Sequence, residues 1–112
     1  MQLTVDPRPG GVAVVRLVGR LDLPVAPAVK DRLAQTVASG NPRLVVDLGE
    51  VSFVDSSGLG ALIGGLKAAR LHGGDLRIAR PADQARLILG LTTLDRVLQV
   101  HGTVEEAVAG YG

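Results

Sequence analysis

The order of its hydrophobic patterns is the feature that most constrains the fold of this chain. Two apolar runs, Leu3–Val5 and Val12–Gly19, flank the segment DPRPGG. Successive side chains of the second run fall into two alternating sets, which is typical of a strand. The prolines and glycines between the runs predict a turn, because both residue types interrupt regular structure. The chain is therefore predicted to begin with a β-hairpin.

After the hairpin, helical and strand patterns alternate. A helix is expected to begin between Asp22 and Pro24, and Pro27 fits only in its first turn, where a missing amide is tolerated. The later predicted elements are a strand Arg43–Leu48, a helix Ser57–Leu71, a strand Asp75–Arg80, a helix Ala82–Leu89, a strand Arg96–Val100 and a helix capped by Thr103, with Glu106 at the capping-box position. This order predicts one α/β domain over residues 1–112, with a mixed sheet that is antiparallel at its start and parallel afterwards.

Composition excludes several classes of function. The net charge is +1, and Phe53 and Tyr111 are the only aromatic residues, so nucleic-acid binding is not expected. The absence of cysteine excludes disulfides and thiolate chemistry. No cluster of His, Asp and Glu has metal-ligand spacing, and no cofactor is expected. Neither a signal peptide nor an apolar run long enough to span a bilayer is present, so we expect a soluble, cytoplasmic domain with no membrane contact.

The segment FVDSSGLGALIGG, residues 53–65, is an unusual start for a helix. Asp55, Ser56 and Ser57 lie where the helix should begin, and Asp and Ser are preferred caps that contribute about 1 kcal/mol. Capping does not explain the glycines that follow, because each glycine inside a helix costs about 1 kcal/mol relative to alanine. These glycines are Gly58, Gly60, Gly64 and Gly65.

Gly60 and Gly64 are four residues apart and share one face of the predicted helix, which Lys67 extends. Leu59 belongs to the apolar stripe beside that face. A face without side chains either lets the helix pack closely within its own domain or lets the backbone of another protein approach. The glycines alone do not decide between these two interpretations.

Three chemical interpretations of the segment fit poorly. Its spacing, G-x-G-x-x-x-G, matches no phosphate-binding fingerprint, and V-D-S-S-G is not the G-x-S-x-G of a hydrolase elbow. A serine triad would need His72, expected to cap a helix end, or His101, expected to be a solvated turn residue. A phospho-acceptor aspartate at Asp55 would need a lysine late in the chain, and the last lysine is Lys67.

A serine hydroxyl at a helix amino terminus is, in contrast, a good place for a phosphate. The terminal amides and the helix dipole favour an anion there. Phosphorylation would add a charge of about −1.5 to −2 at neutral pH. A partner docked on this nearly neutral surface would then meet a bulky dianion, and the loss of binding would act as a switch.

The segment VVDLGEVSFVDSSGLGALIGGLKAARLHGGDLRIA resembles the core of STAS domains, specifically those of bacterial anti-sigma factor antagonists. The resemblance continues through VVRLVGRLDLPVAPAVKDRL before it and LILGLTTLDRVLQVHGTVEEAV after it. It implies a mixed sheet with about four helices packed largely on one side. It also implies phosphorylation of the serine directly after the aspartate, which is Ser56, with Ser57 in a capping or orienting role.

The resemblance further implies a role in transcription regulation through protein interaction, without enzyme activity. The unphosphorylated domain would bind an anti-sigma factor that is also an ATP-dependent serine kinase, and would thereby release the sigma factor. The kinase would then phosphorylate Ser56 and dissociate, and a PP2C-type phosphatase would restore the serine. The partner-binding residues expected are Asp22, Asp55, Ser56, Ser57, Gly58, Leu59, Gly60, Gly64 and Lys67.

Two other functions stay open on the sequence. One is a constitutive STAS subunit of a transport or signalling complex, which would use the same surface without phosphorylation. The other is a small serine hydrolase, which would require ester turnover that depends on Ser56.

Overall fold

One five-stranded sheet, with strand order β1-β2-β3-β4-β5, organises the computed structural model, which describes residues 1–112. The first pair of strands is antiparallel and the other three pairs are parallel. The elements are β1 (Gln2–Arg8), β2 (Val12–Leu21), α1 (Ala26–Ala38), β3 (Arg43–Val54), α2 (Ser56–Leu71), β4 (Asp75–Ala79), α3 (Asp83–Leu91), a 3-10 turn η1 (Leu94–Arg96), β5 (Gln99–His101) and α4 (Val104–Ala109). The predicted α/β fold with a mixed sheet is confirmed.

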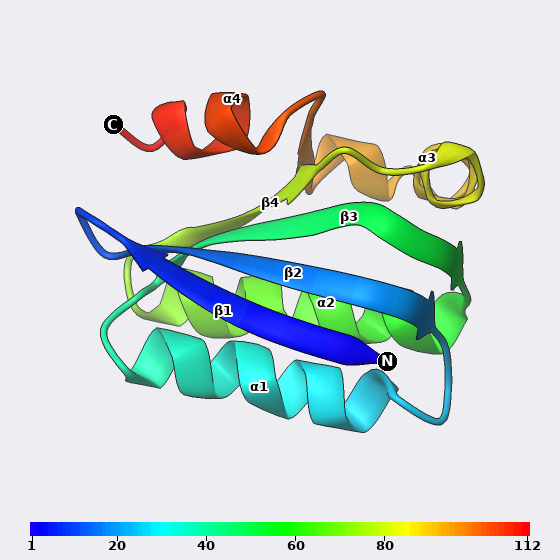
Figure 1. Ribbon diagram of the computed structural model, residues 1–112, viewed down its shortest axis with the longest axis horizontal. Coiled ribbons are helices and arrows are strands. Elements are labelled where there is room, and N and C mark those ends of the chain that lie inside the picture. Colours follow the sequence, from blue (N-terminus) through cyan, green and yellow to red (C-terminus); the bar gives the residue numbers. More distant parts are fainter.

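The helices lie on both faces of the sheet, but unequally (Figure 1). Helices α1 and α2 run side by side along one face, and α4 covers part of the other. The large core of 23 buried residues lies on the α1 and α2 side and also takes in Ala85 and Leu89 of α3. The core around α4 has only five buried residues. No helix is both long enough and apolar enough to cross a membrane.

Strand β1 extends further than the sequence suggested. Pro7 was expected in the turn, but it lies inside β1, opposite Ala13 of β2. Proline is tolerated there because β1 is an edge strand, so the missing amide faces no neighbouring strand. The turn itself is confined to residues 9–11, where Gly10 and Gly11 adopt positive φ angles.

Helix α1 begins later than predicted, at Ala26, and its N-cap residue Val25 makes no side-chain cap. Asp22 instead accepts hydrogen bonds through its backbone carbonyl from the amides of Val25 and Ala26. The prediction for Pro27 is confirmed, because it lies in the first turn of the helix.

Strands β3 and β5 differ most from expectation. The apolar run predicted β3 only as far as Leu48, but the strand continues to Val54 through a polar stretch. Strand β5 was expected over Arg96–Val100, yet it begins at Gln99, because Arg96 belongs to the 3-10 turn before it. At the last helix Thr103 does act as the cap, accepting a hydrogen bond from the amide of Glu106 at 3.1 Å.

Candidate functional site

Asp55 forms the junction between β3 and α2. It is the N-cap of α2, and its Oδ1 accepts a hydrogen bond from the amide of Gly58 at 2.8 Å. Its Oδ2 accepts a second from the amide of Leu23 at 3.0 Å, and its own amide donates to the carbonyl of Leu21. One side chain therefore caps a helix and also holds the loop between β2 and α1 against the helix start. Such a cap contributes about 1 kcal/mol.

Ser56 and Ser57 are the first two residues of α2, the first exposed and the second half-buried. The capping role expected for Ser57 belongs to Asp55, and neither serine hydroxyl has a hydrogen-bond partner within the protein. The backbone amides of both serines also lack a protein acceptor. This helix start therefore combines two free hydroxyls with two free amide donors, an arrangement that favours an anion.

Gly58 and Leu59 lie inside the domain. A Cβ atom at Gly58 would collide with the carbonyl oxygen of Leu21, so a side chain there would push α2 away from the end of β2. Leu59 is only 5% exposed and belongs to the large core. These two residues shape the surface around Ser56 rather than form part of it.

The remaining glycines of α2 divide between packing and open surface. A Cβ atom at Gly65 would lie 2.6 Å from Leu33 Cδ1, so this glycine permits the close approach of α1. One at Gly64 would lie 2.8 Å from Cε of Lys30, whose side chain crosses the helix there. One at Gly60 would have no neighbour within 4 Å. Close packing thus explains Gly58 and Gly65, whereas Gly60 leaves the helix surface open.

Asp22 lies half-buried in the loop that Asp55 anchors. Its Oδ2 pairs with Nε of Arg20 at 3.2 Å, and the Arg20 guanidinium lies 4.4 Å from the centre of the Phe53 ring. Arg20 and Phe53 are register partners on β2 and β3. Asp22 therefore lies at the same end of the sheet as Ser56.

Gln84 supports the site, and sequence reasoning did not identify it. Its Oε1 accepts from the amide of Val54 at 2.8 Å, and its Nε2 donates to the carbonyl of Val54 at 2.9 Å. Strand β4 ends opposite Asp47, so no strand lies beside residues 48–54 on that side. The side chain of Gln84 takes the place of a strand for the residue just before Asp55. A glutamine in the first turn of a helix carries no local signal for this role.

An ion pair between a buried aspartate and an exposed arginine forms the second missed support. Asp47 of β3 is 5% exposed and pairs with Arg80 through two contacts of 3.0 Å, Nε to Oδ1 and Nη2 to Oδ2. Its Oδ1 also accepts from the amide of Gly49 at 3.0 Å. The hydrogen bond and the charge of Asp47 raise the pKa of Arg80 above its ordinary value. An acid within the apolar run RLVVDL was the signal that a cation partner existed.

The two histidines are not paired with a serine. His72 ends α2, as expected, and its Nδ1 lies 3.0 Å from the carbonyl oxygen of Ala68. It is therefore one helix length, about 24 Å, from Ser56. His101 was expected in a solvated loop, but it lies half-buried on β5 and its Nε2 is buried without a hydrogen-bond partner. No three acidic or histidine side chains gather as ligands for a metal ion.

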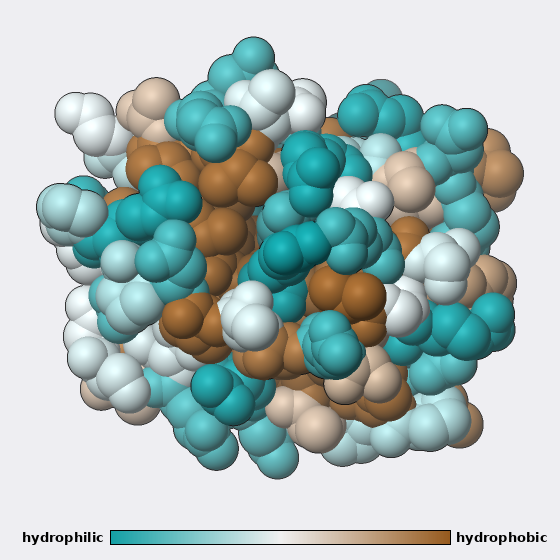
Figure 2. All heavy atoms as spheres, viewed as in Figure 1, coloured by the Kyte–Doolittle hydropathy of each residue, from teal (hydrophilic) through white to brown (hydrophobic).

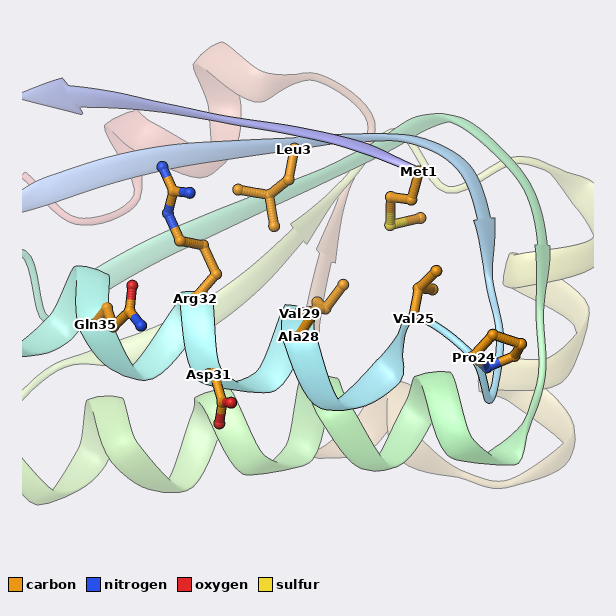
Figure 3. Close-up of a pocket in the computed structure, with 9 residues that line it drawn as sticks. All are labelled: Met1, Leu3, Pro24, Val25, Ala28, Val29, Asp31, Arg32 and Gln35. Carbon is orange, nitrogen blue, oxygen red and sulfur yellow. The ribbon is translucent and has the colours of Figure 1, made fainter.

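Of the surface hollows that adjoin α1, two lie near its first half. The larger, of about 500 Å³, lies between β1 and α1, where Met1 and Leu3 point toward Val25 and Val29 (Figure 3). The smaller, of about 420 Å³, lies on the other flank, beside the start of α2. It is lined by Leu23, Ala26, Pro27, Lys30, Ser57, Gly60 and Ala61, and is called the α1–α2 groove below. On the face shown in Figure 2, apolar atoms form patches interrupted by polar side chains.

Comparison with known proteins supports the resemblance in both sequence and fold. The family model described as STAS domain matches residues 4–107. An anti-sigma-B factor antagonist of Staphylococcus aureus is 30% identical over 91 residues, which are 81% of this chain and 84% of that protein. The crystal structure of an anti-sigma factor antagonist from Mycobacterium paratuberculosis has a TM-score of 0.86 at 28% identity, over 97% of this chain and 92% of that one.

The anti-sigma factor antagonist SpoIIAA shares the fold in two chemical states. Its unphosphorylated form has a TM-score of 0.82 at 21% identity, over 96% of this chain and 93% of that one. The phosphorylated form of the Bacillus protein has a TM-score of 0.76 at 20% identity, over 99% and 100% of the two chains. At this level of identity the match concerns the fold alone.

Proposed function

This chain belongs to the STAS domain family, and on that premise we propose that it is an anti-sigma factor antagonist switched by phosphorylation of Ser56. The unphosphorylated form binds an anti-sigma factor that is also an ATP-dependent serine kinase, and binding releases the sigma factor. Relatives of this chain are named anti-sigma-B factor antagonists. The domain itself is then the substrate of the kinase rather than an enzyme.

The observation that carries this proposal is the environment of Ser56. Its side chain is exposed at the first position of a 16-residue helix, beside two amides without a protein acceptor. Asp55 keeps both carboxylate oxygens engaged by the amides of Gly58 and Leu23, so the loop and the helix start are held together beside the exposed serine. A kinase can therefore reach the hydroxyl without unfolding the loop.

The chemistry requires nothing from this chain beyond a presented hydroxyl. The Oγ of Ser56 attacks the γ-phosphorus of ATP, the bond to the ADP oxygen breaks, and the hydroxyl proton passes to a base of the kinase. The product carries about two extra negative charges on a domain whose net charge is +1. A PP2C-type phosphatase, which uses metal-activated water, hydrolyses the ester and restores the hydroxyl.

The test begins with Ser56→Ala as bait in the native cell, because a form that cannot be modified should retain its partner. The captured kinase is then purified and incubated with ATP and the natural chain. We expect one added phosphate by intact mass, at Ser56 by peptide mapping. Ser52→Ala, a change of an exposed serine four residues earlier, should accept phosphate normally.

Three outcomes would contradict the proposal in different ways. Phosphate at Ser57 would move the site, and the absence of any phosphate with the captured partner would remove the switch. Retained binding by Ser56→Asp, together with a transporter rather than a kinase as partner, would indicate a constitutive subunit instead.

A further inference from the structure

We infer that an apolar side chain of the partner docks in the α1–α2 groove. In the partner, carboxylates flank this side chain. This inference rests on the proposed function, because it specifies the chemistry of the partner that binds beside Ser56. The groove has an apolar rim and an uncovered floor next to Ser57. Its cationic border is the observation that identifies the occupant.

The floor of the groove is open because α2 has no side chain at Gly60. A Cβ atom there would meet nothing within 4 Å, and Ala26 and Ala61 add only methyl groups to the lining. Leu23 stands at the rim with 66% of its surface exposed, although its backbone amide is fixed by Asp55. An exposed leucine on a rigid loop, next to a hollow with a bare floor, is suited to contact with an apolar side chain.

The chain has two lysines, Lys30 in the lining of this groove and Lys67 further along α2. Lys30 lines it from α1, and the missing side chain of Gly64 lets the Lys30 stem lie across α2. Lys67 lies on the same face of α2, one turn beyond Gly64, and is exposed. Neither ammonium group has an acidic partner within 4 Å, although five arginines of the chain do.

The acidic groups beside the groove are already engaged. Asp22 pairs with Arg20, and both oxygens of Asp55 accept backbone amides. Asp31, the residue after Lys30, lines the other hollow with Met1 and Leu3. The positive charges of Lys30 and Lys67 are therefore not neutralised by the domain itself, and carboxylates of a partner complement them.

This chemistry also accounts for the direction of the switch. Ser57 lines the groove, and Ser56 precedes it on the same helical turn. A phosphate on Ser56 places two negative charges at the mouth of the groove, where it attracts the same lysines and repels the carboxylates of the partner. An acidic partner is released by phosphorylation, whereas a basic one would be held more tightly.

The test uses peptides as probes, so that it needs neither a kinase nor ATP. The first probe is a short capped peptide with a central leucine between glutamates, titrated into the unphosphorylated full chain and followed by amide chemical shifts. We expect shifts at Ala26, Lys30 and Gly60. A peptide with lysines in place of the glutamates should bind about tenfold more weakly, and added salt should reduce the difference.

Matched variants separate the groove from general charge effects. Lys30→Glu should weaken the glutamate peptide about tenfold, whereas Arg32→Glu should leave it unchanged. Arg32 lies on the same helix but lines the hollow on the other flank of α1. Gly60→Met should abolish the shifts by filling the floor. It should not lower the melting temperature, because the position is open and methionine is a better helix former than glycine.

Three results would overturn the inference. They are equal binding of the glutamate and lysine peptides, equal effects of Lys30→Glu and Arg32→Glu, or an absence of shifts at the groove. Because no phosphorylation is involved, the groove can fail this test while Ser56 is still a kinase substrate. Conversely, the groove can bind the glutamate peptide as expected while Ser56 fails as a kinase substrate.

Discussion

The two halves of β3 are built in different ways. From Arg43 to Asp47 the strand is hydrogen-bonded to β2 on one side and to β4 on the other. From Glu50 to Val54 it pairs with β2 alone, and register shifts interrupt that pairing. The side chain of Gln84 in α3 takes the place of a neighbouring strand at Val54, and Arg80, which follows β4, pairs with Asp47. The half that carries the site is thus supported by a few specific hydrogen bonds, whereas the other half is supported by the regular sheet.

This difference separates global stability from local order. A change in the first half removes core packing and should destabilise the whole domain. A change in the supports of the second half should act mainly on the segment that leads to Ser56. The variants below, in order of decreasing effect, test that separation.

The largest effect is expected for Leu44→Ala in the first half. Leu44 is fully buried in the large core, and leucine-to-alanine changes at such positions cost about 2–5 kcal/mol. Denaturant unfolding should show a lower midpoint with an unchanged slope. Hydrogen exchange should accelerate throughout the core, and acceleration confined to β3 would contradict a single cooperative sheet.

The ion pair between Asp47 and Arg80 should come next. In Arg80→Ala the carboxylate of Asp47, which is 5% exposed, would keep only the hydrogen bond from the amide of Gly49. We expect the free energy of unfolding to fall by about 2–3 kcal/mol. Arg16→Ala is the matched control, because Arg16 pairs with Glu50 on the surface and such pairs contribute about 0–1 kcal/mol. Equal losses in unfolding experiments would show that burial of Asp47 has no influence.

Gln84→Ala tests the support nearest the site. It leaves both backbone groups of Val54, a residue 1% exposed, without a partner, and each unsatisfied buried group costs about 1–3 kcal/mol. Because the segment can open locally, the free energy of global unfolding should fall by only about 1–2 kcal/mol. Hydrogen exchange at the amide of Val54 should accelerate strongly. Arg86→Ala, an exposed truncation on the same helix, should change neither quantity. Unaltered exchange at Val54 would mean that water replaces Gln84.

The same contrast explains which parts of the molecule sequence reasoning reached. The hairpin, α2 and the parallel order of β3 and β4 follow from local periodicity and from glycine and proline stops. The supports of the site join residues that are 30 and 33 positions apart, Gln84 with Val54 and Arg80 with Asp47. Nothing in the local pattern around Gln84 specifies its partner. The polar residues after Leu48 also hid the second half of β3, because that half does not depend on apolar burial on both faces.

The position of the site was easier to predict than the hydrogen bonds that hold it. The order Asp-Ser-Ser-Gly after an apolar run indicates a helix start, and the sequence placed that start at Ser57, one residue later than the structure does. The division of roles among the polar residues was not, because capping preferences are similar for Asp and Ser. Only the fold brings Leu23, 32 positions earlier, within reach of Asp55 and thereby selects the carboxylate as the cap.

The smallest of these effects is expected for Asp55→Ala, which removes that cap. Loss of the hydrogen bond to Gly58 should cost about 1 kcal/mol, and exchange at the amides of Gly58 and Leu23 should both accelerate. Asp55→Asn separates the two bonds, because its single carbonyl oxygen can still cap Gly58 while its amide group cannot accept from Leu23. If the amide of Gly58 stays protected from exchange in this variant while the amide of Leu23 loses protection, the second carboxylate oxygen is what anchors the loop. If both amides stay protected in Asp55→Ala, the β2–α1 loop is held by its own packing and the carboxylate is only a helix cap.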